Sequence, residues 1–276
     1  MRRAEAEGGA DRRAAADAAA PDRDRPEGGS RRFQVRPALV IARLTWLRLV
    51  RGRAIWVTVL LCTIPILVAL VAALQISDAA ERWSIVAELS FRSLVLLAPV
   101  VHLAAALGEE SDGKTYTYLW SRPFPRRAVL LGKMLAMTPL LCVLAPAALV
   151  GGYAIVAAGA GSVEPAWLAR ALPAAILGVV TASAFALGLG ALVPRHPLVA
   201  ALAWVFIGEQ ILPAVPAVQN LSALHHVEVL AALPRPPSSI SGGPAEAAIA
   251  LLILAGAWLA VALWRVQAFE PGSVDG

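Results

Sequence analysis

Six apolar segments, each close to the length that crosses a lipid bilayer, constrain this chain more than any other feature of its sequence. They cover residues 54–74, 91–107, 134–160, 171–193, 197–212 and 247–264. A helix needs about 20 apolar residues to span the hydrocarbon core. Every backbone polar group inside a bilayer must be hydrogen-bonded, and the alternating pattern of barrel strands is absent, so only helices fit. The sequence therefore predicts an all-α membrane protein with six transmembrane helices.

Composition and charge agree with this prediction. Hydrophobic residues make up 58% of the chain and charged residues 16%, against about 25% charged residues in soluble domains. The net charge is +5, but 13 of the 24 Lys and Arg residues precede Ala54. They flank the first apolar segment, so we expect membrane lipid as their partner and no nucleic acid. Cys62 and Cys142 lie inside apolar segments without metal-ligand spacing, and no metal site is expected.

The chain divides into a tail and a membrane domain. Residues 1–35 are poor in large apolar residues and are predicted to be a disordered tail. Residues 36–270 form the predicted permease domain. Within it, residues 37–53 mix apolar residues with arginines at helical spacing, which is typical of an elbow helix in the membrane interface. A cytosolic extension of the first span explains the same pattern, and both readings stay open.

The distribution of basic residues predicts the topology. With the N-terminus inside, 20 Lys and Arg residues fall in cytoplasmic segments, and four, Arg82, Arg92, Arg170 and Arg235, fall outside. The positive-inside rule then predicts a multi-pass protein of the cell (plasma or inner) membrane with both termini in the cytoplasm. Arg92 would reach outward from the start of the second span. Residues 213–246 would be an external loop that contains a short helix within residues 220–233.

The cytoplasmic connection between the second and third spans is unusually rich in acidic, aromatic and basic residues. It resembles the corresponding segment of the ABC-2 family of transporter permeases. The matching residues, in the order of that family's motif, are Glu109-Glu110, Thr115, Tyr118-Leu119-Trp120, Ser121-Arg122-Pro123, Arg126-Arg127 and Gly132-Lys133. Lys114 departs from the motif, because the family most often has glycine at that place.

The resemblance implies that residues 108–127 form a coupling helix that docks onto a separate ABC ATPase subunit. The residues expected to contact that subunit are Glu109, Glu110, Thr115, Tyr116, Tyr118, Trp120, Arg122, Pro123 and Arg126. Aromatic residues are enriched in the centres of interfaces, and charges set the register of docking. The same aromatic and basic residues would also suit anchoring at the headgroup level. The resemblance further implies an exporter that works as a homodimer or with a homologous permease.

An enzymatic function is not expected. Gly108 to Thr115 matches the phosphate-binding loop pattern, but it follows a transmembrane segment instead of a strand, and its three acidic residues would repel phosphate. No catalytic residue is assigned and no cofactor is expected on this chain; ATP and Mg²⁺ would bind the ATPase subunit. An intramembrane enzyme of unknown chemistry remains an alternative, although the usual metalloprotease and serine-hydrolase motifs are absent.

Polar residues within the apolar segments are candidates for the translocation path. Glu209 and Gln210 interrupt the fifth segment, and His102 lies in the second. An acidic group in mid-span marks function by default, unless it lies near the interface or pairs with a neighbouring helix. A secondary transporter working alone is a second alternative. It predicts internal repeats, broken helices and paired charges within spans, and the sequence shows no clear repeat and no such pair.

Overall fold

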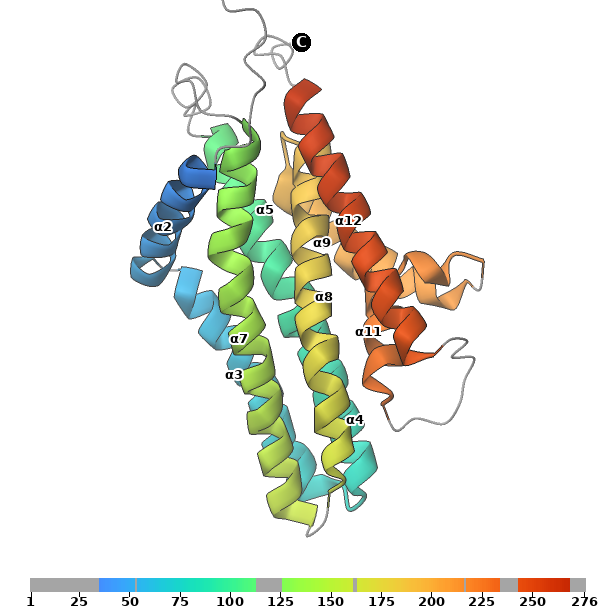
Figure 1. Ribbon diagram of the computed structural model, residues 1–276. Helices are drawn as coiled ribbons and strands as arrows, with labels where there is room; N and C mark the ends of the chain where they lie inside the picture. The colour runs from blue at the N-terminus through green and yellow to red at the C-terminus, as the bar shows by residue number, and fades with distance from the viewer. Residues whose placement is uncertain are drawn as a thin grey trace, which may run out of the picture. The chain divides into compact units, whose positions relative to one another are not determined.

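The computed structural model of the protein describes residues 35–52, 54–112, 126–160, 163–215, 217–233 and 243–268. All regular elements in these ranges are helical (Figure 1). In chain order they are α2 (Val35–Arg51), α3 (Ala54–Gln75), α4 (Ala79–Ser90), η1 (Phe91–Leu97), α5 (Ala98–Asp112), α7 (Arg126–Ala160), α8 (Pro165–Leu192), α9 (Pro197–Ala203), η2 (Trp204–Gly208), α10 (Glu209–Ile211), η3 (Leu212–Ala214), η4 (Gln219–Leu221), α11 (Ala223–Ala231) and α12 (Pro244–Ala268). The predicted tail, except for Val35, and most of the predicted coupling segment lie outside the described residues.

Six helical stretches are long and apolar enough to cross a membrane, which confirms the predicted fold class. They are Ile55–Gln75, Ala79–Leu107, Arg127–Gly159, Pro165–Leu192, Pro197–Ala214 and Pro244–Val266. α7 runs without interruption through Pro139 and Pro146. The second, third, fourth and sixth stretches begin before the predicted apolar runs, because the helices continue into polar and small residues.

The second stretch shows the largest difference from the prediction. It begins at Ala79 instead of Phe91, because Asp78 caps the helix by accepting a hydrogen bond from the Glu81 backbone N–H at 2.9 Å. α4, the π-helical η1 and α5 then follow one another without a break. Arg92 therefore lies in the middle of this stretch, and the expectation that it reaches outward from a helix start was wrong. Arg82, also assigned to the exterior, lies on the same stretch.

α8 is the central helix of the bundle. It packs against α5, α7, α11 and α12 (Figure 1). Its apolar window is 67% buried, whereas the windows of the first, fifth and sixth stretches are 22–28% buried. Small residues make the close packing possible: a Cβ on Gly178 would meet Val95 and Val227, and one on Gly188 would meet Trp258.

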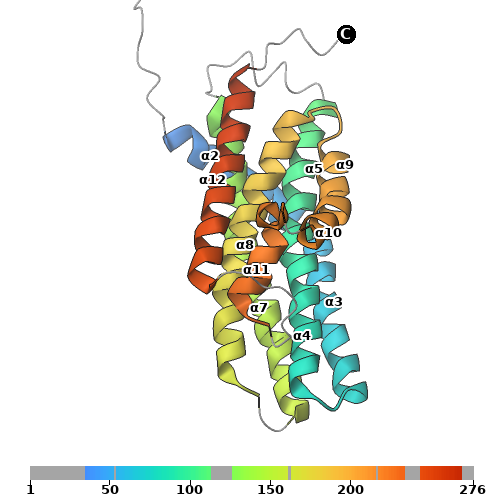
Figure 2. The same cartoon turned by 90° about the vertical axis from the view of Figure 1, so that its right-hand side faces the viewer.

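The fifth stretch does not continue as one regular helix. α9, the π-helical η2 and the short α10 reach Glu209–Ile211, and 3₁₀ turns and irregular backbone follow. Figure 2 shows α9 ending at α10 at about the middle of the bundle, beside α11. α11 packs against α8 and α12 and buries Leu224, Val227 and Val229. The short helix predicted within residues 220–233 is therefore present, and it is part of the bundle instead of a separate surface loop.

α2 covers one end of α7. Gly132 provides the contact, because a Cβ there would lie 2.8 Å from the Ala38 carbonyl oxygen and from Ile41. Leu39, Leu44 and Leu47 point away from the bundle and are exposed. The exposed apolar side fits a helix on the membrane surface, and this placement of α2 stays a prediction.

Candidate functional site

The predicted ATPase contact lies between two described helices. Glu109 and Glu110 fall in the last turns of α5, and Arg126 is the first residue of α7. The expected contact residues between these helices lie outside the described residues: Thr115, Tyr116, Tyr118, Trp120, Arg122 and Pro123. The structure therefore describes the two helices that flank this segment, α5 and α7, and the docking role of the segment stays a prediction.

Lys133 and Gly132 hold these two helices in contact with the rest of the bundle. Lys133 is 5% exposed, and its Nζ donates a hydrogen bond of 2.5 Å to the carbonyl oxygen of Ala106, near the end of α5. The neighbouring Gly132 lets α2 approach α7 closely. The Gly-Lys pair at the end of the motif thus joins α5, α7 and α2 at the end of the bundle from which the predicted coupling segment extends.

Glu209 binds the N-terminus of α11. Its side chain is 4% exposed. One carboxylate oxygen accepts hydrogen bonds from Ser222 Oγ at 2.7 Å and from the Leu224 N–H at 3.0 Å, and the other accepts from the Ala223 N–H at 3.3 Å. A carboxylate suits this place because the backbone N–H groups of a first turn have no partner within the helix and carry partial positive charge. Glu209 thus joins the end of the fifth stretch to α11.

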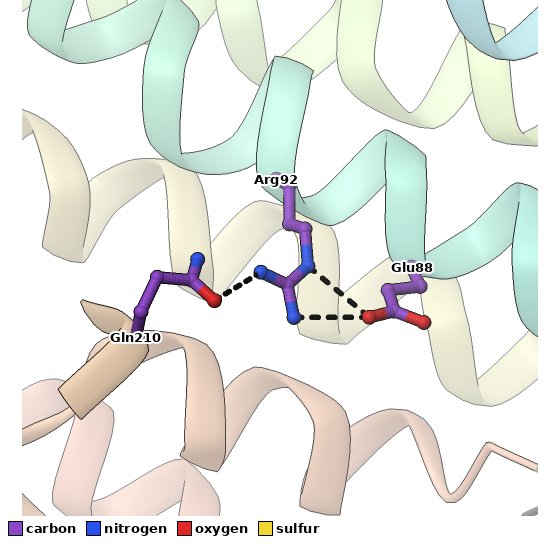
Figure 3. A network of polar contacts seen from close by, with 3 residues as sticks. All are labelled: Glu88, Arg92 and Gln210. Atoms are coloured by element: carbon purple, nitrogen blue, oxygen red, sulfur yellow. Dashed lines mark hydrogen bonds and ion pairs between the residues drawn. The ribbon is translucent and has the colours of Figure 1, made fainter. Parts of the chain in front are cut away.

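Gln210 takes part in a different polar network (Figure 3). Its Oε1 accepts a hydrogen bond of 2.8 Å from Arg92 Nη1. Arg92 also donates from Nε at 3.2 Å and from Nη2 at 2.9 Å to Glu88 Oε1, four residues earlier on the same helix. The prediction that paired charges are absent from the spans was therefore wrong. The hydrogen bond from Arg92 to Gln210 connects the second stretch to the fifth.

The positive charge of Arg92 also acts on the Glu228 carboxyl group of α11. Burial raises the pKa of the Glu228 carboxyl above its ordinary value, and the nearby Arg92 guanidinium opposes that rise in part. The three residues joined by these hydrogen bonds, Glu88, Arg92 and Gln210, are called the mid-span cluster below. Arg92 belongs to η1, and Gln210 follows η2 by two residues. π-helical turns inside α-helices occur frequently at functional sites.

The remaining candidate of the translocation path lies elsewhere. His102 is 6% exposed, and its Nε2 lies 2.5 Å from Thr58 Oγ1 on α3. This contact matches a packed, hydrogen-bonded histidine. His225 and His226 stack edge to face at 5.3 Å, and His226 Nε2 lies 3.0 Å from the Asn220 carbonyl oxygen. No group of three possible metal-ligating side chains occurs among the described residues.

A small pocket adjoins Glu209. Three aromatic rings on its wall pack against one another, with centroids 5.0–6.4 Å apart, on Phe185, Trp204 and Trp258. Thr181 on the same wall donates to the Leu251 carbonyl oxygen at 3.1 Å, which joins α8 to α12. The pocket has room for about one water molecule. It therefore belongs to the packing between helices and holds no cargo in this conformation.

Sequence reasoning found Gln210 but missed its contact with Arg92 and the contact of Arg92 with Glu88. One signal was available, because Asp78 and Glu81 have the spacing of a capping box and mark a helix start before Phe91. Extending the helix to that start places Glu88 and Arg92 one turn apart in mid-span. The contact between Arg92 and Gln210 cannot be predicted from a local sequence pattern, because the two residues are 118 positions apart.

Comparison with known families agrees with the six-helix bundle. The sequence profile of the family described as ABC-2 family transporter protein matches residues 39–265. No curated protein matches the chain. The match covers most of the chain and omits only the first residues of α2 and the last residues of α12 from the described helices. The chain therefore belongs to the ABC-2 transporter family and is a multi-pass membrane permease component of an ABC transporter.

Proposed function

We propose that this chain is the membrane-spanning subunit of an ATP-driven exporter and that residues 108–127 dock onto a separate ATPase subunit. The observation that carries the proposal is the family match, which covers the candidate spans and the connection between the second and third of them. ATP and Mg²⁺ would bind the partner, and two permeases, identical or homologous, would enclose the path. The membrane would be the plasma or inner membrane, with both termini in the cytoplasm.

The helices around the predicted coupling segment support this role. Lys133 ties the start of α7 to the end of α5, and α2 packs on α7 at Gly132. A push on the segment would therefore act on three helices together, because packed helices move as stiff bodies. α5 continues from η1, which carries Arg92 of the mid-span cluster.

The first experiment tests docking. Trp120→Ala removes an aromatic anchor, and Arg122→Glu reverses a charge in the predicted contact. Both variants should lower co-purification of the ATPase subunit by about tenfold, the effect of losing about 1.4 kcal/mol of binding free energy. Membrane insertion should be unchanged. Arg170→Glu is the matched control, since Arg170 is exposed near the start of α8, at the other end of that helix from the segment. Wild-type recovery for both segment variants would remove the docking role.

A secondary transporter that works without ATP is a second candidate. The ion pair of Glu88 with Arg92 in mid-span and the irregular backbone after α10 favour it, because such features mark the binding sites of these transporters. The two candidates differ in their energy source. Uptake into proteoliposomes that contain both subunits should require ATP, and transport that an ion gradient alone sustains would favour the second candidate.

A further inference from the structure

We propose that Lys133 is the positioning residue that passes a movement of the predicted coupling segment to the fifth span, through the end of α5. The inference deepens the proposed function and rests on it, because it takes docking of the ATPase subunit as given. The first half of the route joins α7 to α5 at Lys133. The second half leads from Leu107 of α5 past Gly190 of α8 to Pro197, the first residue of α9.

Lys133 is buried more deeply than stability alone would favour. It is 5% exposed, and its Nζ donates a hydrogen bond of 2.5 Å to the Ala106 carbonyl oxygen. Lysine is almost never fully buried unless it is paired. Taking an ammonium group out of water is costly, and apolar residues of similar volume often hold helices together as well or better. A buried lysine at this contact is therefore better explained by a functional role than by packing.

The contact lies at the base of the predicted coupling segment. Lys133 follows Arg126, the first residue of α7, by seven residues, and Ala106 precedes Asp112, the last residue of α5, by six. At 1.5 Å per residue, the contact is about 10 Å from the point where the segment joins each helix. Because the acceptor is a backbone carbonyl, Lys133 holds the main chain of α5 itself. A displacement of α7 is therefore passed to α5 directly.

Close packing continues the route beyond α5. Leu107, the residue after Ala106, is 8% exposed. A Cβ on Gly190 of α8 would lie 2.5 Å from Leu107 Cδ1 and 3.5 Å from Pro197 Cβ, so both side chains lie against this glycine. Figure 2 shows α5, α8 and α9 side by side in the upper part of the bundle. Contacts without free space transmit a displacement, because a packed interior is hardly compressible.

The fifth span is suited to be the element that moves. Within the chain its apolar window is 22% buried, whereas that of α8 is 67% buried. Elements with few buried contacts are displaced at a lower cost in free energy than the core. At the far end of this span, Glu209 contacts the first turn of α11 and Gln210 contacts Arg92. A displacement that enters at Pro197 therefore acts on both of these contacts.

Electron paramagnetic resonance tests this route without a known cargo. The protein carries Cys62→Ala and Cys142→Ala, and a nitroxide label is attached to Val199→Cys, because Val199 lies on α9 and is 65% exposed. The complex with the ATPase subunit is reconstituted into proteoliposomes. Spectra are recorded before and after addition of ATP, Mg²⁺ and vanadate, which traps the ATPase during its cycle by mimicking the transferred phosphoryl group.

Two substitutions on α7 make the comparison. Lys133→Met removes the ammonium group and keeps a side chain of similar length. Thr138→Val is the matched control, because Thr138 is 8% exposed and its Oγ1 has no hydrogen-bond partner among the described residues. Lys133→Arg keeps a cationic donor at this position. Leu107→Ala interrupts the next contact of the route and gives the same test if Lys133→Met does not insert.

We expect the fraction of labels that changes line shape on vanadate trapping to fall at least about threefold in Lys133→Met, an effect within the range of substitutions along coupling networks. Thr138→Val should leave this fraction unchanged, and Lys133→Arg should restore most of it. Co-purification of the ATPase subunit and the melting temperature of Lys133→Met should stay near wild type, because the Ala106 carbonyl keeps its partner within α5. A merely structural role predicts a lower melting temperature with an unchanged response.

An unchanged response in Lys133→Met would overturn the inference. So would an equal loss of response in Thr138→Val, or a loss of co-purification in Lys133→Met, which would make Lys133 a folding or docking residue. A label at Val199→Cys that does not respond to trapping in the parent protein would show that the fifth span is not moved from this end. Failure of the parent protein to co-purify with the ATPase subunit would instead remove the proposed function, so the two failures are told apart.

Discussion

Single side chains carry the connections that hold the irregular half of the bundle together. Glu209 and Gln210 are neighbours in α10, yet they serve different partners: Glu209 binds the first turn of α11, and Gln210 accepts from Arg92 on η1. Two adjacent residues thus tie α11 and the second span to the end of the fifth. An acidic residue that looks like a path residue in the sequence is engaged by backbone N–H groups in the structure.

Removing the Glu209 carboxylate should destabilise the protein. Glu209→Ala leaves Ser222 Oγ and the N–H groups of Ala223 and Leu224 without their acceptor, and each buried unsatisfied group costs about 1–3 kcal/mol. Glu209→Gln keeps one acceptor oxygen and should lose less. Thermal unfolding in detergent measures both. Ile211→Ala is the control on the same element, because Ile211 is 55% exposed. Equal melting temperatures for Glu209→Ala and Ile211→Ala would contradict the capping role.

Glu228 should make stability depend on pH in a predictable direction. Burial raises the pKa of its carboxyl in the folded protein, so protonation favours the folded state. The contribution of Glu228 to stability is fully present below the unfolded pKa and is lost as the pH rises through the raised, folded pKa. Glu228→Gln should therefore melt at a higher temperature than wild type near pH 8, and the gap should close towards about pH 4. A variant that is less stable at pH 8 would show that the attraction to Arg92 outweighs burial.

At the scale of helices, glycine decides where two elements can meet. A Cβ at Gly132 would meet the Ala38 backbone carbonyl and Ile41 below 3.0 Å, so α2 or α7 would have to shift. Gly256 in α12 has open space around the same position. The two positions make a matched pair, since both are helical glycines within the described bundle and only one supports a helix crossing.

Gly132→Ala should lower the free energy of unfolding by about 1–3 kcal/mol through overpacking. Gly256→Ala should leave it unchanged or raise it by up to about 1 kcal/mol through helix propensity. Chemical or thermal unfolding of both variants in one detergent compares them. If Gly132→Ala were as stable as Gly256→Ala, α2 would not be held against α7 in solution. Lys133→Met would then be the next variant, since it removes the hydrogen bond to Ala106.

At the scale of the whole molecule, the structure changes the charge count behind the predicted topology. Of the four arginines assigned to the exterior, Arg82, Arg92 and Arg170 lie on candidate spans. By the same rule, Arg127, Lys133 and Arg265 leave the cytoplasmic count, so 17 Lys and Arg residues remain in segments assigned to the cytoplasm, against Arg235 alone in an assigned external segment. The positive-inside asymmetry is therefore stronger than the sequence count indicated.

Labelling from the two sides of the membrane tests this topology. Ser77 and His196 are exposed and lie in connections at opposite ends of the bundle, the first between α3 and α4 and the second between α8 and α9. In a background without native cysteines, an impermeant thiol reagent should label Ser77→Cys in intact cells. It should label His196→Cys only after permeabilisation. The reversed pattern would put the predicted coupling segment outside the cell, out of reach of any cytoplasmic ATPase.

Hydrophobic length and local patterns allowed the sequence to predict the six helices. A run such as residues 54–74 has no soluble conformation that buries it, so length alone assigns a span. The short helix before α12 was also predictable from its composition. The position of α11 in the bundle was not predictable, because residues of other elements hold it there. Val227 of α11 and Val95 both lie against Gly178 of α8, and Glu209 binds the first turn of α11.

The membrane fold and the family resemblance could be read from the amino-acid sequence, because both depend on local composition and on motifs within one segment. Which polar residues act together follows only from the folded arrangement of the helices. Glu209 was brought to the first turn of α11, and Arg92 was brought to Gln210 across 118 residues of chain. Such pairings depend on how helices cross and on where a helix ends, and these follow from packing in three dimensions instead of from neighbours in the sequence.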